Sequence, residues 1–347
     1  MKPHHADLIQ DRIIQAIREN QEFLLLTHVN PDGDGLGSLV ALQRALDGLG
    51  KKSCVLFPGE ITPEYGFLVA REEMVRSLTP GKRWDVVFIL DTPCASRLPE
   101  SLSGVVPDSK ERINIDHHTG NTIQGTLNWV DAKASSVGEM IFWLFERAGY
   151  SVSPEIATAL YTAILTDTGS FRFPNTRSSA LRAAAMLVDY GVDAAGVADR
   201  VYASHLLEKY RLLGEALSTL QRCCSGRAAF MWVTSEMLRK AGASRVETEG
   251  FVNFPRDLRG VEVAIFFKQE DDGQKVKVSL RSKGNVVEVC RVAAGFRGGG
   301  HPTAAGCTIK GVMEFVQEQV LKAVSEELAR ADAVVSGSAA KQTSSRG

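Results

Sequence analysis

The chain has 347 residues, which exceeds the usual length of one domain and predicts two domains, each large enough to bury its own core. Its 40 lysines and arginines against 41 aspartates and glutamates give a formal net charge of −1, so no whole-molecule field indicates a nucleic-acid or membrane partner. The six cysteines contain no Cys-x-x-Cys pair, which argues against a disulfide-stapled secreted fold and fits reduced thiols.

The first twenty residues predict an amphipathic helix and not a targeting signal. Ile9, Ile13 and Ile17 recur at helical spacing among charged residues, unlike the unbroken apolar stretch of a signal peptide. No apolar run approaches the length of a transmembrane helix. We therefore expect a cytoplasmic protein without a membrane partner.

From residue 22 onward, strand and helix patterns alternate with short connections. Apolar strands are predicted at 23–27, 52–57, 84–90 and 112–115, and a helix that ends in glycine is predicted at 35–50. Strands that are apolar on both faces and separated by helices predict a parallel sheet covered by helices on both faces. Helical patterns follow at 135–150, 154–166 and 178–191.

The pattern changes in the C-terminal part of the chain. Segments 261–267 and 275–281 alternate apolar and polar residues with period two, as antiparallel strands with one solvated face do. The sequence thus predicts an α/β domain at 1–193, a helical connector at 194–222 and a smaller α+β domain at 223–332. The small, polar tail at 333–347 is expected to be disordered.

Acidic residues and histidines follow several of the predicted strands. His28 comes directly after the first strand, Asp91 follows the strand at 84–90, and Asp116 follows the strand at 112–115. The carboxyl ends of strands in an open α/β sheet share one crevice, where ligands bind. The same crevice is expected to collect the other candidates, which lie in a glycine-rich turn, next to Asp116 and at a helix end: Asp32, Asp34, His117, His118 and Asp167.

Five carboxylates and three imidazoles in one place favour metal ions, because isolated buried charges are costly unless a cation compensates them. Hard oxygen ligands mixed with imidazole, without an evident thiolate, favour manganese or magnesium over structural zinc. Two such ions bridged by one carboxylate would support hydrolysis at phosphorus. The alternative is that Asp32 and Asp34 only cap the following helix and that the histidines are hydrogen-bonded core residues. For all eight residues together this alternative is improbable.

Four segments in this order resemble the motifs of the DHH phosphoesterase family: THVNPDGDGLGS (27–38), LDTP (90–93), NIDHH (114–118) and ILTDTGSF (164–171). Two further segments, VSLRS (278–282) and GGGHPTAAG (298–306), resemble the substrate-binding domain that accompanies one branch of this family. Length and two-domain layout are most similar to the NrnA type. Members of that type act as oligoribonucleases on very short RNA and as phosphatases on 3′-phosphoadenosine 5′-phosphate (pAp).

The resemblance implies a role for each residue of the N-terminal motifs. His28 and Asp32 would bind one metal ion, a second set of residues would bind the other, and Asp91 would bridge both; the second set is Asp34, His117 and Asp167. Asp116 would orient its histidine neighbours through hydrogen bonds. His118 would contact the scissile phosphate as a hydrogen-bond donor or proton shuttle.

The C-terminal motifs imply a phosphate-binding loop. Gly298, Gly299 and Gly300 leave backbone amides unshielded, so the loop could wrap a phosphate together with His301 and a nearby arginine. On the strand before it, Arg281 shares one face with Lys275 and Lys277 and is expected to point into an interdomain cleft, with Ser282 beside it in the motif. A solvated basic strand face is the alternative for the two lysines. The roles of Arg97 and Arg297 stay open.

We therefore expect an enzyme with two divalent metal ions, Mn²⁺ before Mg²⁺, and an active site in the cleft between its domains. Its substrates would be short RNA oligonucleotides, cleaved to 5′-mononucleotides, and pAp, which would lose its 3′-phosphate. The alternatives are a cyclic di-AMP, pApA or other dinucleotide phosphodiesterase, and, in another class, a non-catalytic nucleotide-binding module. A homodimer is implied by the resemblance alone.

Overall fold

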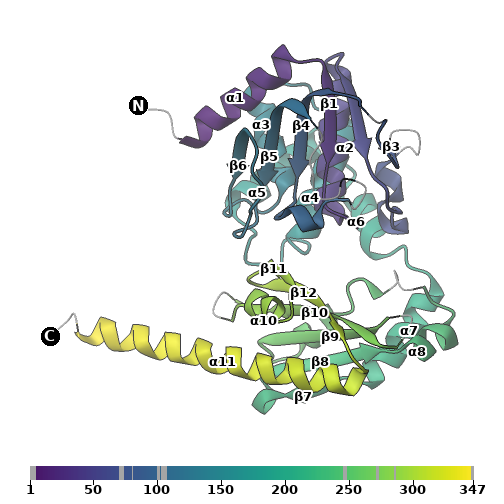
Figure 1. Cartoon of the computed structure of the whole chain (residues 1–347), viewed down its shortest axis with the longest axis vertical. Helices are drawn as coiled ribbons and strands as arrows, with labels where there is room; N and C mark the ends of the chain where they lie inside the picture. The colour runs from purple at the N-terminus through teal and green to yellow at the C-terminus, as the bar shows by residue number, and fades with distance from the viewer. Residues whose placement is uncertain are drawn as a thin grey trace. The chain divides into compact units, whose positions relative to one another are not determined.

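The computed structural model describes residues 5–69, 74–79, 81–99, 102, 108–244, 248–270, 273–284 and 287–344. Of residues 5–7, 301 and 335–344 it describes the backbone alone. The chain forms two compact units, Met1–Ser204 and His205–Gly347, each built on its own sheet (Figure 1). The division falls inside the connector predicted at 194–222, so the helix before Ser204 belongs to the first unit and the helix after it to the second.

The first unit contains a six-stranded sheet in the order β3-β2-β1-β4-β5-β6. All of its neighbouring strands are parallel, as predicted. The strands are β1 (Glu22–Leu26), β2 (Lys52–Leu56), β3 (Met74–Val75), β4 (Trp84–Leu90), β5 (Ser109–Asp116) and β6 (Leu127–Val130). Because β1 lies between β2 and β4, the strand order reverses at the β1–β4 pair, where ligands bind in open sheets of this kind.

Both faces of this sheet are buried, because successive side chains of a strand point to opposite sides. Phe23 and Leu25 belong to a large core that the α-helices of the unit share, whereas Leu24 and Leu26 belong to a smaller core packed by Leu98 and other connecting residues. The helices are α1 (His5–Glu19), α2 (Gly33–Gly48), α3 (Val137–Ala148), α4 (Pro154–Asp167), α5 (Ser178–Asp189) and α6 (Ala194–Tyr202). Two short 3-10 helices are η1 (Pro63–Leu68) and η3 (Ala95–Arg97).

The second unit also has a six-stranded sheet, in the order β11-β12-β10-β9-β8-β7. Only the β8–β9 pair is parallel among these neighbours, so the sheet is mixed, as expected for an α+β domain. The strands are β7 (Gln221–Cys223), β8 (Ala228–Val233), β9 (Val263–Gln269), β10 (Lys275–Ser282), β11 (Gly299–His301) and β12 (Ala304–Lys310). Along β10 the even-numbered residues are buried and the odd-numbered ones are more exposed, which confirms the predicted alternation.

Helices pack on both faces of this second sheet. One core gathers residues of α10 (Val289–Gly295) and α11 (Met313–Ser344), and the other gathers residues of α7 (Leu207–Ser218) and α8 (Ser235–Ala241) together with the segment that leads into α9 (Asn253–Asp257). The short 3-10 helix η5 (Cys224–Gly226) joins β7 to β8. Helix α11, the long yellow helix of Figure 1, continues to Ser344 and so differs from the disordered tail predicted from residue 333. Its continuation is consistent with the alanines of this segment, which favour helix despite the small polar residues around them.

No α-helix in the described part of the chain combines the length and the apolar character that a membrane span requires.

Candidate metal centre

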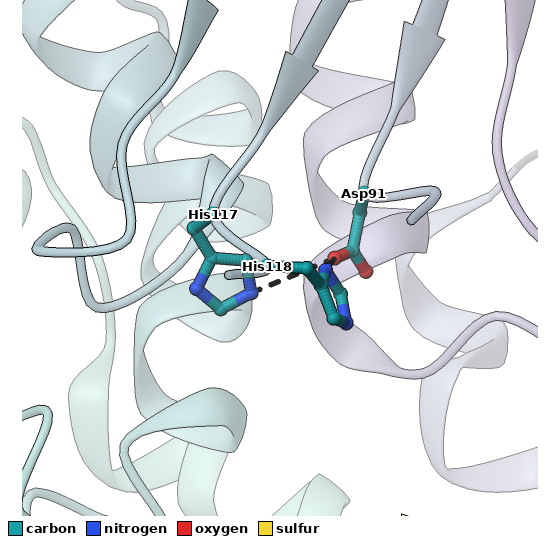
Figure 2. Close-up of side chains that lie close together, drawn as sticks. All are labelled: Asp91, His117 and His118. Carbon is teal, nitrogen blue, oxygen red and sulfur yellow. Dashed lines mark ion pairs between the residues drawn. The ribbon is translucent and has the colours of Figure 1, made fainter. Parts of the chain in front are cut away.

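The predicted ligands of the first unit meet at the carboxyl edge of the parallel sheet. Asp91 follows the last residue of β4 directly, His28 lies two residues beyond the end of the neighbouring β1, and His117 follows β5 on the other side of β4. Figure 2 shows Asp91 at the end of its strand, with the rings of His117 and His118 turned toward its carboxylate. The strand order alone therefore gathers three sequence-distant motifs.

Four nitrogen–oxygen distances define the centre of this cluster. His28 Nε2 lies 3.5 Å from Asp91 Oδ2, and His117 Nε2 lies 3.6 Å from Asp91 Oδ1. His117 Nε2 also lies 3.7 Å from Asp34 Oδ2 and 3.7 Å from Asp167 Oδ2. These separations are longer than the usual N–H···O hydrogen bond of about 2.7 to 3.2 Å. They are close to the roughly 3.0 to 3.4 Å that separate neighbouring ligands bound about 2.1 Å from one cation.

The ligand atoms fall into groups small enough to surround an ion. His28, Asp32 and Asp91 form one group, and Asp34, His117 and Asp167 form another; in each, the ligand atoms lie within 4.8 Å of one another. Asp91 also groups with His117 and His118. Asp91 thus belongs to the first group and also lies against His117 of the second, which is the position that a bridging ligand requires. Which residue binds which ion stays a prediction.

Asp91 has two further unusual properties. Its backbone adopts a left-handed conformation with φ 51°, which is uncommon for a residue other than glycine and is concentrated at functional sites. Its Oδ1 atom is buried without a hydrogen-bond partner among the described residues. A buried carboxylate oxygen without a donor is costly, and a cation would compensate it.

Asp32 and Asp34 are held by helix N-termini. Asp32 Oδ1 accepts hydrogen bonds from the N–H groups of Asp34 and Gly35, so this residue does cap α2, as the alternative interpretation of the sequence supposed. Asp34 instead accepts from Val137 N at 2.8 Å and Gly138 N at 2.9 Å, at the start of α3. Capping fixes the direction of each carboxylate without excluding a role as metal ligand.

Glycines permit this arrangement because the helices approach one another closely. A Cβ at Gly138 would lie 2.4 Å from Cβ of Ala163 in α4, and a Cβ at Gly33 would lie 2.4 Å from the hydroxyl of Thr166 in the same helix. Any side chain at either position would push α4 away, and with it Asp167.

Two asparagines that the sequence did not single out position these side chains. Asn175 Nδ2 donates to the backbone oxygen of Ser135 at 2.9 Å, and to the backbone oxygen of Asp167 at 3.1 Å and its Oδ2 at 3.3 Å. Asn121 Nδ2 donates to Asp116 Oδ2 and to the backbone oxygen of Thr92. Asn175 follows Asp167 by eight residues and Asn121 follows Asp116 by five, and no periodicity or spacing in the sequence marks either one.

Asp116 is fully buried and orients His118. Its Oδ1 lies 2.7 Å from His118 Nδ1, while Asn121 occupies its Oδ2. Asn121 is fixed in turn, because its Oδ1 accepts from Ile123 N and from Asn114 Nδ2. Nε2 of His118 is the ring nitrogen that this hydrogen bond to Asp116 does not use.

The pKa values show how protons balance the charges of this cluster. Burial lowers the pKa of His117 and His28, but the carboxylates of Asp167 and Asp91 outweigh it and raise both. Burial raises the pKa of Asp34 well above its ordinary value and that of Asp167 to about 7, whereas the two imidazoles hold the pKa of Asp91 well below its usual range despite its burial. Bound protons therefore compensate the negative charge of these carboxylates. Divalent metal ions would compensate the same charge, and the residues present fit such ions.

Arg97, whose role the sequence left open, lies beside the first ligand. Its Nη2 is 3.0 Å from Nδ1 of His28, and the same Nδ1 is 2.9 Å from the backbone oxygen of Val29. A metal bound through Nε2 requires the proton on Nδ1, which then donates to Val29. The side chain of Arg97 is exposed at this rim of the cluster.

The motif residues of the second unit lie in and beside β10, β11 and β12. Arg281 is paired in register with Ala304 of β12, which is itself paired with His301 of β11. Ser282 is buried, and its hydroxyl donates to the backbone oxygen of Val287 at 2.8 Å, so this hydroxyl is committed to the fold. Whether Ser282 also contacts the substrate stays a prediction.

The three glycines of this motif differ from one another. A Cβ at Gly298 would lie 2.2 Å from Gly306 O, and a Cβ at Gly300 would lie 2.4 Å from Ala304 O, so both are required by the close approach of β12. Gly300 also has φ 140°. A Cβ at Gly299 would meet open space, which leaves this position accessible to a ligand.

Comparison with known proteins identifies the family of the chain. Residues 22–164 match the DHH family, N-terminal domain, and residues 228–330 match the DHHA1 domain. Over 311 residues the chain is 38% identical to the bifunctional oligoribonuclease and PAP phosphatase NrnA of Thermus thermophilus, covering 88% of this chain and 90% of the relative. It is 29% identical over 304 residues to NrnA of Bacillus subtilis, with 87% and 93% covered.

A solved structure of an exopolyphosphatase-related protein from Bacteroides fragilis has the same fold, with a TM-score of 0.85 and 26% identity, and the match covers 94% of this chain and 98% of that one. The chain therefore belongs to the DHH phosphoesterase family and, within it, to the NrnA type that carries a DHHA1 domain.

Proposed function

We propose that this protein is a two-metal phosphoesterase that hydrolyses short oligoribonucleotides to 5′-mononucleotides and removes the 3′-phosphate of pAp. The observation that carries the proposal is the pair of ligand groups at the ends of β1, β4 and β5, with Asp91 standing between them. The printed names of the relatives, oligoribonuclease and PAP phosphatase, agree with this chemistry.

Six residues would hold the metals: His28, Asp32, Asp34, Asp91, His117 and Asp167. When bound, two divalent ions would supply Lewis-acid activation of water and neutralise charge on the phosphoryl oxygens. Their ligands are oxygens and imidazole nitrogens, which favour Mn²⁺ and also suit Mg²⁺. Removal of the metals would return the cluster to the proton-balanced state described above.

His118 would contact the substrate directly. His118 Nδ1–H donates to Asp116, so in the imidazolium form Nε2–H would donate to a phosphoryl oxygen or pass its proton to the departing oxygen. Asn121 keeps Asp116 in the orientation that this requires. The side chain of His118 is only 14% exposed, so its range of positions is small before substrate binds.

The second unit would recognise the phosphate and sugar of short substrates. Arg281, whose Nη1 donates to Leu280 O at 3.0 Å, and the exposed backbone of Gly299 would supply the guanidinium and amide donors that suit a phosphate. A site closed by such a loop favours substrates of two to five nucleotides, as expected from the sequence, because a long strand needs repeated stacking platforms. The cleft between the units and the homodimer stay predictions, as does the cytoplasmic location.

One assay tests this function. Purified protein is incubated with Mn²⁺, Mg²⁺ or EDTA against pAp, a dinucleotide, a 24-mer, cyclic di-AMP and pyrophosphate. We expect turnover of pAp and of the dinucleotide with Mn²⁺, none with EDTA and little on the 24-mer. Best activity on cyclic di-AMP would indicate the phosphodiesterase alternative. Best activity on pyrophosphate, or none on any substrate, would overturn the proposal.

A further inference from the structure

Helix α10 ends in a Schellman motif, in which two backbone N–H groups fold back onto the last turn. Arg297 N donates to Ala294 O at 3.0 Å, and Gly298 N donates to Ala293 O at 2.9 Å. The motif requires a left-handed residue at its turning point, and Arg297 fills that position with φ 59°. Glycine is the usual residue there, because a Cβ makes this conformation unfavourable.

Five other helices in the described part of the chain end with the same pair of hydrogen bonds and carry glycine at the turning point. These glycines have φ between 55° and 101°, and they follow α2, α3, α4, α5 and α8: Gly50, Gly149, Gly169, Gly191 and Gly242. Arginine at the end of α10 is therefore an exception within one molecule. Because a non-glycine residue is strained in this conformation, its side chain is expected to contribute something that outweighs the strain.

The fold itself does not explain this side chain. Arg297 is exposed, and within the described part of the chain its guanidinium makes no hydrogen bond or ion pair. A positive charge near a helix C-terminus is favourable, but α10 has only seven residues, and lysine would serve the same purpose. Among the described residues, no contact within its own unit accounts for this guanidinium.

The place of Arg297 in the sheet indicates what that partner is. Two residues later the chain enters β11, the edge strand, whose Gly299 and Gly300 are exposed. In an antiparallel pair, alternate residues direct N–H away from the partner strand, so one of these two glycines offers an outward amide. A guanidinium beside outward amides forms a set of donors suited to a phosphate group.

We propose that Arg297 is a substrate-binding residue that contacts a terminal phosphate of the nucleotide, and that the strained cap is retained for this contact. The inference rests on the proposed function and adds a specificity to it. A dinucleotide with a 5′-phosphate should be preferred over the same dinucleotide with a 5′-hydroxyl, and Arg297 should carry the preference.

The test compares the full-length wild type with Arg297→Gly, Arg297→Asn and Arg297→Lys, with Arg239→Gln at the end of α8 as the charge-matched control. Arg297→Gly relieves the cap, so its apparent unfolding temperature should rise by about 2 to 4 °C. Its KM for the 5′-phosphorylated dinucleotide should nevertheless rise about tenfold or more, with kcat within about twofold and the 5′-hydroxyl dinucleotide unaffected. Arg297→Lys keeps the charge and should lose only part of the preference.

The remaining outcomes separate the two proposals. If Arg297→Gly and Arg297→Asn turn over both dinucleotides as the wild type does, the role of Arg297 is wrong while the proposed function stands. If Arg239→Gln raises KM equally, the effect is one of general charge, and this inference fails. A wild type that neither binds pAp in calorimetry nor hydrolyses a dinucleotide would overturn both.

Discussion

The carboxyl edge of the first sheet and the β10–β12 part of the second sheet use their motif residues in opposite ways. At the first, buried imidazoles and carboxylates face one another at 3.5 to 3.6 Å, longer than a usual hydrogen bond, and Asp91 Oδ1 has no hydrogen-bond partner among the described residues. At the second, Ser282 donates to a backbone oxygen, and Gly298 and Gly300 make room for β12. The first region has polar atoms that a cation would compensate, whereas most of the motif residues of the second are used by its own fold.

This difference separates two kinds of motif residue. Residues that the fold leaves unsatisfied at a cost point to a ligand, because burying an uncompensated charge is unfavourable. Residues that the fold already uses point first to architecture, even when they stand beside a ligand. The experiments below test whether this division is correct.

The largest effect is expected from Asp91→Ala. Without the residue that stands between both ligand groups, kcat should fall at least about a thousandfold and metal content, measured by elemental analysis, should drop. The control is Asp85→Asn, at the opposite end of the same strand, where the carboxylate bonds the backbone of Gln21 and Glu22 and should not affect turnover. A fully active Asp91→Ala protein would show that the first region is not a metal centre.

Asn121→Ala tests whether orientation of His118 matters. Loss of the amide that holds Asp116 should lower kcat by about tenfold to a hundredfold, with a smaller change in KM, as for other residues that orient a functional histidine. Asn128→Ala is the matched control, because Asn128 bonds Gly125 and Asn114 and not Asp116. Equal losses of kcat in both variants would indicate a general structural effect.

The charge balance of the first region predicts a pH effect on stability without metal. The folded-state pKa of Asp167 is raised to about 7, and those of Asp34, His28 and His117 are also raised. The pKa of Asp91 is lowered, which matters only near and below the ordinary pKa of an aspartate, so above that pH the folded protein binds more protons than the unfolded chain. The free energy of unfolding should therefore fall as pH rises from about 4 through 7, by on the order of a few kcal/mol.

Divalent metal should reverse this trend, because it replaces the bound protons. Thermal unfolding at pH 6 and pH 8, each with EDTA or Mn²⁺, measures the effect, and the increase in unfolding temperature caused by Mn²⁺ should be larger at pH 8. An increase that is independent of pH would mean that metal does not displace these protons.

The smallest effect concerns the second region and would sharpen the division within its motif. Ser282→Ala removes a buried hydrogen bond to Val287 and should lower the free energy of unfolding by about 1 to 2 kcal/mol while KM stays unchanged. Arg281→Gln, at the preceding residue, should raise KM for pAp and change the free energy of unfolding little. Denaturant titration and steady-state kinetics on pAp distinguish the two. A raised KM in Ser282→Ala would place this residue at the ligand after all.

Much of the fold could be predicted from local patterns of apolar and polar residues in the sequence. Alternation of apolar strands with helices predicted a parallel sheet, and period two in 275–281 predicted a half-exposed strand, because burial of one or both faces imposes these patterns. The short strands β3 and β6 were not predicted, since two to four residues carry little periodicity. The helical end of α11 also differed from the expected disorder.

The candidate ligands could be identified from the sequence because their chemical types are unusual for a core and each follows a strand or begins a turn. The residues that position these ligands could not be identified from the sequence. Asn175 and Asn121 have ordinary spacing, and the N-terminus of α3 reaches Asp34 across more than a hundred residues of chain. Whether Ser282 faces a ligand or a backbone oxygen likewise depends on the loop that follows it.

The amino-acid sequence by itself determined the class of fold, the types of ligand and the order of the motifs, since these follow from hydrophobic period and from side-chain chemistry. Only the tertiary structure decided which oxygens are left without donors, which glycines are required by close packing, and that an arginine occupies a left-handed helix cap. These depend on contacts between distant segments. Which donor bonds which acceptor, and where the packing leaves room for a side chain, depends on the whole fold. No local sequence pattern predicts it.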